Sequence, residues 1–134
     1  MIDAKLQQEI VLRTADRVGV LADITRALSE MGISLLSIRL RSTEEEAVVY
    51  LVTNSQSYAR DALQDAGFDI SERDVVILEL PHHPGFVRRA TEVLARKDIS
   101  IDDLHASVPE GCDVGVVVLT CSNNAHAIQI LRGR

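Results

Sequence analysis

The chain has 134 residues, 46% of them hydrophobic and 25% charged, which is a usual composition for a globular protein. Its net charge of −6 argues against nucleic-acid binding, which needs a concentrated basic face. No apolar run reaches the roughly 20 residues of a membrane span, and residues 1–5 lack the pattern of a secretory signal. Two cysteines fit a reducing compartment. We therefore expect a cytoplasmic protein that contacts neither nucleic acid nor membrane.

The first half of the sequence predicts elements in the order β-α-β-β-α-β. Alternation predicts a strand over residues 6–15, and apolar residues at helical spacing predict an amphipathic helix that ends at Gly32. Asp16 is the expected N-cap of that helix. The remaining elements are strands over 34–41 and 47–53, a helix over 56–66 and a short closing strand from residue 68. This is the ferredoxin-like order.

Within the strand expected over 34–41, apolar and polar residues alternate. The apolar residues are expected to face inward and the polar ones outward. The inward set is Leu36, Ile38 and Leu40, and the outward set is Ser37, Arg39 and Arg41.

The second half repeats the first half at a distance of 66 residues, so that Gly19 and Ser34 correspond to Gly85 and Ser100. It predicts strands over 75–80, 101–107 and 114–120 and helices over 86–97 and 125–131. The fourth strand of this copy is missing, so the N-terminal segment, the other module or a second chain must cover a sheet edge. We expect an α+β protein of two tandem ferredoxin-like modules, 1–73 and 74–134. Each should carry its helices on one face of an antiparallel sheet, and the sheets should join side by side.

The glycine turns of both copies resemble the ACT domain family of small-ligand regulatory modules. In the first copy the motif is residues 16–21, Asp-Arg-Val-Gly-Val-Leu, followed by 32–35, Gly-Ile-Ser-Leu. In the second copy it is 83–87, His-Pro-Gly-Phe-Val, followed by 98–101, Asp-Ile-Ser-Ile. Val18 replaces the family's usual proline, and the second copy lacks the glycine after its helix. The resemblance implies a freestanding tandem ACT protein that binds an amino acid without catalysis or a cofactor.

The resemblance also implies where the ligand lies: between the strand-to-helix loop of one module and the start of the second strand of an adjacent module. In the first copy the implied residues are Thr14, Asp16, Val18, Gly19, Val20, Leu21 and Ser34. In the second copy they are His82, Pro84, Gly85 and Ser100. Free N–H groups at a helix start suit a carboxylate, and Asp16 can accept from an ammonium. Leu80, which stands where the first copy has Thr14, cannot hydrogen-bond through its side chain, which favours the first site.

Simpler interpretations stay open at this point. Asp16 can serve only as a helix cap, and Gly19 and Gly85 only as turn residues. His82 and His83 lack the spacing and the further ligands of a metal site, and no nucleophile or phosphate-binding motif occurs. The alternative function is a ligand-free adaptor or regulatory subunit that binds a metabolic enzyme through the same fold. We expect a homodimer.

Overall fold

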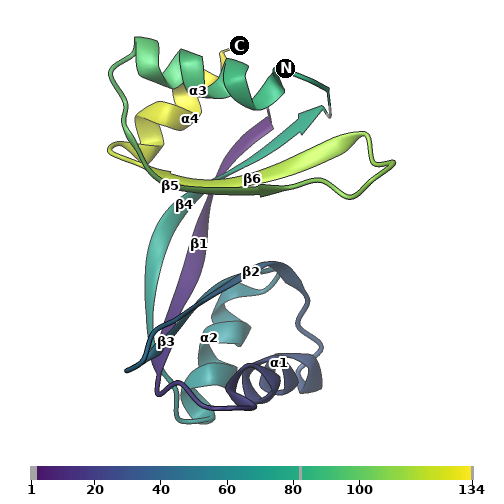
Figure 1. The fold of residues 1–134 in the computed structure, drawn as a ribbon, viewed down its shortest axis with the longest axis vertical. Helices are drawn as coiled ribbons and strands as arrows, with labels where there is room; N and C mark the ends of the chain where they lie inside the picture. The colour runs from purple at the N-terminus through teal and green to yellow at the C-terminus, as the bar shows by residue number, and fades with distance from the viewer. Residues whose placement is uncertain (1–2, 82, 134) are drawn as a thin grey trace. The chain divides into compact units, whose positions relative to one another are not determined.

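The computed structural model describes residues 3–81 and 83–133 (Figure 1). Their order follows the expected repeat, with one difference: the expected closing strand from residue 68 and the expected strand over 75–80 form one continuous strand, because no glycine or proline interrupts residues 69–80. The elements are β1 (Asp3–Thr14), α1 (Val20–Glu30), β2 (Leu35–Ser42), β3 (Ala47–Thr53), α2 (Gln56–Asp65), β4 (Asp69–Pro81), α3 (Phe86–Arg96), β5 (Ile101–Ser107), β6 (Val114–Cys121) and α4 (Asn124–Arg132).

The first compact unit comprises residues 8–73. Its strands are ordered β2-β3-β1-β4, which is the ferredoxin-like order. Antiparallel pairing sets Leu12 of β1 opposite Val49 of β3. The apolar stripes of α1 and α2 pack on these strands, and the core residues with the largest fully buried side chains are Ile10, Leu12, Ile24, Leu28, Val49, Leu51 and Leu63.

The second compact unit comprises residues 74–133 together with residues 3–7, apart from the undescribed residue 82. Its strands are ordered β5-β6-β4-β1, so residues 3–7 of β1 supply the fourth strand that this copy lacks. Ala4 is fully buried in the core beneath α3 and α4, and its carbonyl oxygen accepts a hydrogen bond of 2.7 Å from Nε of Arg132. Residues 3–7 therefore pack with the second unit instead of the first.

The first helix of each unit begins at a glycine. Gly19 and Gly85 are the N-caps of α1 and α3, with φ values of 89° and 88°, and no side chain caps either helix. Asp16 lies three residues before the cap and accepts a hydrogen bond from Ser42 instead. The prediction of Asp16 as N-cap is therefore wrong, because the left-handed glycine turn separates it from the helix.

Both first helices end in the same hydrogen-bonded turn, although only one has a glycine there. The N–H groups of Ile33 and Ile99 bond back to Leu28 and Leu94 at 3.1 and 3.0 Å. Gly32 carries the left-handed conformation in the first copy, and Asp98, with φ 58°, carries it in the second. Aspartate is among the few residues that tolerate this conformation, so the turn persists without glycine.

The edge strand β2 exposes the apolar residues that were expected to face inward: Leu36, Ile38 and Leu40 are 54%, 39% and 44% exposed. Ile38 pairs with Leu51, whose side chain packs against the helices, so the inward direction is right for Ile38. These side chains are exposed nonetheless, because β2 is the last strand of its sheet and the helices do not cover it. On the opposite face Arg39 lies over the ring of Tyr50 at 4.1 Å.

We predict that Ala4→Asp destabilises the second unit by about 3 kcal/mol or more, because a carboxylate would be buried without a partner. Urea unfolding followed by amide NMR signals of each unit measures this. Lys5→Asp places the same group on the exposed neighbouring residue and should change stability by less than about 0.5 kcal/mol. Equal effects of the two substitutions would contradict the assignment of residues 3–7 to this core.

Candidate functional site

The predicted first-copy residues gather at the turn between β1 and α1, with one exception. Thr14 ends β1 and is half-buried, Asp16, Val18 and Gly19 are exposed, Val20 is buried and Leu21 is half-buried. Ser34 lies beyond the opposite end of α1, roughly 16 Å along a helix of 11 residues. The structure therefore groups six of the seven residues and does not bring Ser34 to them within the unit.

The start of α1 offers hydrogen-bond donors. The N–H groups of Val20 and Asp23 donate to the carbonyls of Arg17 and Gly19 at 3.3 and 3.0 Å. The intervening N–H groups, those of Leu21 and residue 22, have no acceptor among the described residues. Two unpaired donors at the positive end of a helix form an arrangement that suits an anion.

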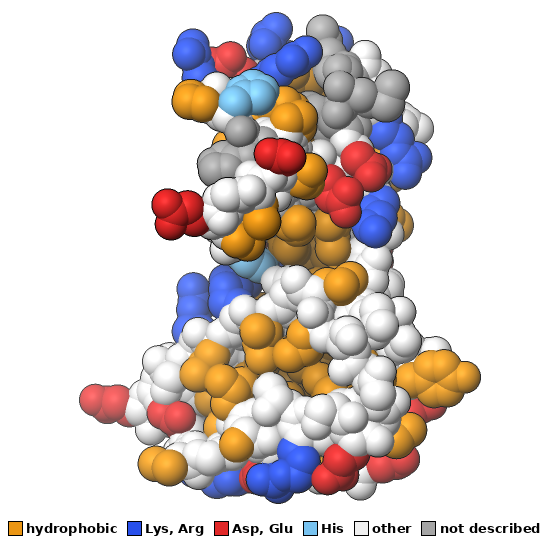
Figure 2. Space-filling view, turned by 90° about the vertical axis from the view of Figure 1, so that its right-hand side faces the viewer, with side chains coloured by type: hydrophobic (Ala, Val, Ile, Leu, Met, Phe, Trp, Pro, Cys, Tyr) orange, Lys and Arg blue, Asp and Glu red, His pale blue; other side chains and the backbone are white. Residues whose placement is uncertain are grey.

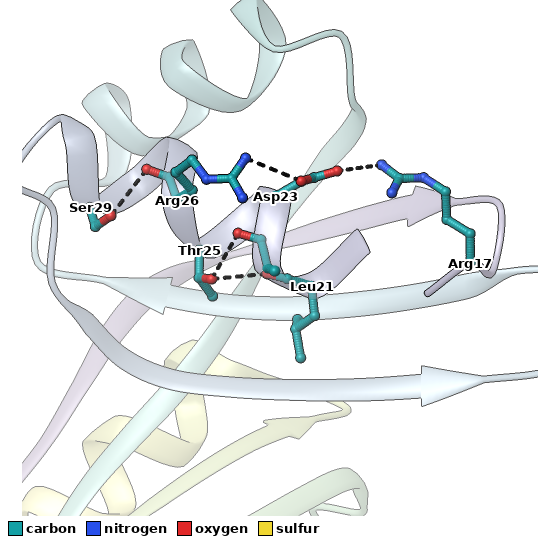
Figure 3. A network of polar contacts seen from close by, with 7 residues as sticks. Arg17, Leu21, Asp23, Thr25, Arg26 and Ser29 are labelled. Atoms are coloured by element: carbon teal, nitrogen blue, oxygen red, sulfur yellow. Dashed lines mark hydrogen bonds and ion pairs between the residues drawn. The ribbon is translucent and has the colours of Figure 1, made fainter. Parts of the chain in front are cut away.

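An ion-pair network ties the turn to the helix (Figure 3). Nη2 of Arg17 lies 2.7 Å from Oδ2 of Asp23, and Nη1 of Arg26 lies 3.4 Å from Oδ1. The hydrogen bond from Arg17 is the main reason why the pKa of Asp23 is below its ordinary value of 3.8. Both carboxylate oxygens of Asp23, the acidic residue in the first turn of α1, face guanidinium groups. The positive charges of Arg17 and Arg26 therefore offset the negative charge of this carboxylate.

Asp16 links the turn to the end of β2. Its Oδ2 accepts a hydrogen bond of 2.5 Å from Oγ of Ser42. Among the described residues Asp16 has no other side-chain partner, so Oδ1 is available as an acceptor. The turn thus presents donors and an acceptor side by side in the sequence.

The second turn has the same backbone and different side chains. Pro84 and Gly85 are exposed, and the N–H of Arg89 donates to the carbonyl of Gly85 at 3.0 Å, as Asp23 does to Gly19. His82, predicted as a site residue, lies outside the described residues. The ring of His83 lies edge-on to Phe86, with 4.8 Å between centroids, and its Nδ1 is 3.1 Å from the carbonyl oxygen of Pro84.

The two predicted serines are held in the same way. The N–H of Ser34 donates to Oδ1 of Asn54 at 3.1 Å, and that of Ser100 donates to Oγ of Ser122 at 3.2 Å. The backbone N–H of Asn54 and of Ser122 returns a bond to the serine carbonyl in each case. A register shift follows in β2 and in β5. The roles of Asn54 and Ser122 were not predicted from the sequence, although their separation of 68 residues repeats the register of β3 and β6.

The titratable groups give no sign of other chemistry. Burial raises the pKa of the Cys121 thiol to about 11, which keeps it protonated near neutral pH. Within the part of the chain that the structure describes, no group of three His, Cys, Asp or Glu side chains is arranged to hold a metal ion. None of the helices in that part is long and apolar enough to span a membrane.

Comparison with known proteins finds a family match in the first half of the chain. Residues 9–62 match the model of the ACT domain family. The predicted resemblance is confirmed, and with it the α+β class of two ferredoxin-like modules. No curated protein sequence matches the chain.

Solved structures resemble the fold of this chain over nearly its whole length. Protein BT0572 from Bacteroides thetaiotaomicron is 21% identical with a TM-score of 0.89, covering 97% of this chain and 89% of that chain. The ligand-free regulatory subunit of aspartate kinase from Thermus thermophilus is 16% identical with a TM-score of 0.72, covering 98% and 95%. The corresponding subunit from Thermus flavus is 15% identical, with a TM-score of 0.64 and the same coverage. At these identities the likeness concerns the fold.

We predict that Arg17→Gln raises the pKa of Asp23 toward its ordinary value of 3.8, because the strongest contact with the carboxylate is lost. Because the pKa of Asp23 is lower in the folded state than in the unfolded state, the ion pair stabilises the protein at a pH above the unfolded-state pKa. This stabilisation is lost as the pH falls from the unfolded-state pKa through the folded-state pKa. NMR titration of the Asp23 carboxyl measures the shift. Arg26→Gln removes only the longer contact and should move the pKa less. An unchanged pKa in Arg17→Gln would contradict this account.

Proposed function

We propose that this protein is a non-enzymatic regulatory protein located in the cytoplasm, and that it binds an amino acid at the glycine turn of its ACT domain. The observation that carries the proposal is the start of α1, where two N–H groups without an acceptor lie five and six residues after Asp16, whose carboxylate has a free oxygen. An amino acid needs both: donors for its carboxylate and an acceptor for its ammonium.

In this proposal each part of the turn has a role. The ligand carboxylate would accept from the N–H groups at the start of α1, and Oδ1 of Asp16 would accept from the ammonium. Gly19 holds the backbone in the left-handed conformation that leaves these donors uncapped, and a Cβ there would meet no atom within 4 Å, so the approach is open. The neutralised Asp23 does not repel the anion.

A second copy of the chain would complete the site. Ser34 lies at the far end of α1 from its own turn, so the Ser34 that reaches a bound ligand would come from another ACT module. The β2 strand fits the contact between copies: it ends the strand order of its unit, and its apolar side chains are exposed. Unpaired strand edges of this kind favour pairing with another chain.

Regulation would follow if the ligand binds one packing arrangement of the modules better than another. The solved structures of aspartate kinase regulatory subunits, with their similar fold, support a regulatory role and an enzyme as partner. The second candidate function is a ligand-free adaptor that uses the exposed β2 edge to bind such an enzyme. It is favoured by the N–H groups of Ser34 and Ser100, which already have partners within the chain.

We expect at least one compound of an amino-acid panel to raise the melting temperature, because a ligand that binds only the folded state stabilises it. Asp16→Ala should abolish this shift while changing the ligand-free melting temperature little, since Asp16 is exposed. Ser42→Ala removes the partner of Asp16 and leaves the carboxylate, so it should keep the shift. Equal loss in both variants would mean that Asp16 serves only the turn. No shift for any compound, together with a co-purifying enzyme, would favour the adaptor.

We expect sedimentation velocity to show a dimer for the wild type and a monomer for Ile38→Lys, because a charged side chain on an edge strand disfavours strand pairing. The matched control is Leu104→Lys, which changes the equivalent residue of β5, itself 37% exposed. This variant should stay dimeric. A monomer in Leu104→Lys and a dimer in Ile38→Lys would place the contact on β5 instead, and a monomeric wild type would rule out the dimer.

A further inference from the structure

An apolar pocket lies within the second unit, beside the start of α3. Its volume is 60 Å³, and the residues that shape it come from the end of β4, the first turn of α3 and the facing ends of β5 and β6. They include Leu80, His83, Val87, Ala106, Val108 and Gly115. All belong to one unit.

The pocket exists because this copy has smaller or less polar residues than the first copy at equivalent places. Ala106 stands where the first copy has Leu40, and Gly115 stands where it has Ala47. Gly115 pairs with Leu80 just as Ala47 pairs with Thr14, which confirms the equivalence. A Cβ on Gly115 would come within 2.5 Å of Cγ2 of Val108, so this approach requires glycine.

The same comparison changes the chemistry of the place. In the first copy Ser42 bonds to Asp16 beside the turn. Val108 replaces Ser42 in the second copy and cannot form such a bond. The polar link of the first copy is thus replaced by an apolar wall in the second.

We infer that this pocket receives the side chain of a branched aliphatic amino acid, valine, leucine or isoleucine, bound at the second glycine turn. The inference rests on the proposed function and names the ligand class of its second site. A volume of 60 Å³ corresponds to about four to six water-sized spheres, since each needs about 10–15 Å³. Three or four carbon atoms fit, an aromatic ring is too large, and a charged side chain would be buried unpaired.

The mouth of the pocket can hold the polar end of such a ligand. The N–H groups of Val87 and Arg88 have no acceptor among the described residues and suit a carboxylate. In the neutral ring of His83, Nδ1 donates to the carbonyl of Pro84, 3.1 Å away, which leaves Nε2 as an acceptor for an ammonium. The edge contact with Phe86 keeps the ring beside the pocket.

The inference is tested by calorimetric titration of the full chain with L-valine, L-leucine and L-isoleucine, compared with L-alanine, L-serine, L-phenylalanine and L-lysine. Each further buried methylene strengthens binding about fourfold, so at least one branched amino acid should bind more than about tenfold tighter than alanine. A preference for serine or lysine, with no gain from branched side chains, would overturn the inference and leave the proposed function standing. No binding by any compound would end both.

Two variants locate the binding. Ala106→Leu places the first-copy residue in the pocket and should lower the affinity for the branched amino acid at least about tenfold. The melting temperature should stay near that of the wild type, because Ala106 is exposed. Val87→Phe fills the pocket from the helix side and should act alike. The control Ser107→Leu adds the same bulk at the next residue, which does not line the pocket, and should bind as the wild type does. Undiminished binding in Ala106→Leu would overturn the inference.

Discussion

A glycine in the left-handed conformation starts the first helix of each unit, and the candidate sites depend on this constraint. Only glycine adopts φ values near 90° without strain, so no capping side chain stands at that position. The N–H groups of the second and third residues of α1 and α3 are therefore left for a ligand or for water. A side-chain cap such as that of α4, where Asn123 accepts from the N–H of His126, satisfies one of these donors and leaves less for an anion.

Duplication has kept the backbone of the turn and changed its side chains. In both copies a glycine starts the first helix, and a residue in the left-handed conformation ends it. In both, the serine before the second strand forms two hydrogen bonds, one through its N–H and one through its carbonyl. Around this frame the first copy is polar, with Arg17 on Asp23 and Ser42 on Asp16. The second copy is apolar, with a pocket beside Ala106. Hydrophobic side chains reach the surface of both units (Figure 2).

The sequence predicted the elements well because their signals are local. Helical spacing and Gly32 located α1, and the 66-residue repeat transferred that assignment to α3, even where Asp98 replaces the glycine. The predictions that failed, or were not made, concern how an element begins and what packs against it. Asp16 has the composition of a cap, but the φ value of Gly19 decides where the helix begins. The alternation of β2 predicted which face its side chains lie on, but it did not predict that the helices leave this edge strand uncovered. The pocket of the second copy depends on a close approach between Gly115 and Val108, which a pattern of residue types does not reveal.

Residues 3–7 can complete the second unit because closing the intervening chain into a loop costs little free energy. The first unit, residues 8–73, is inserted between the fourth strand of the second unit and the rest of it. Loop-closure entropy grows only with the logarithm of loop length, about 0.6 kcal/mol for each doubling, so an insertion of this size adds little cost. Burial of Ala4 and the hydrogen bond from Arg132 to its carbonyl offset that cost at the far end of the loop. Pairing of residues 3–7 with β4 also covers the edge of β4, which in a free second module would invite another chain. The edge left to pair in the first unit is then that of β2, the strand whose apolar side chains are exposed.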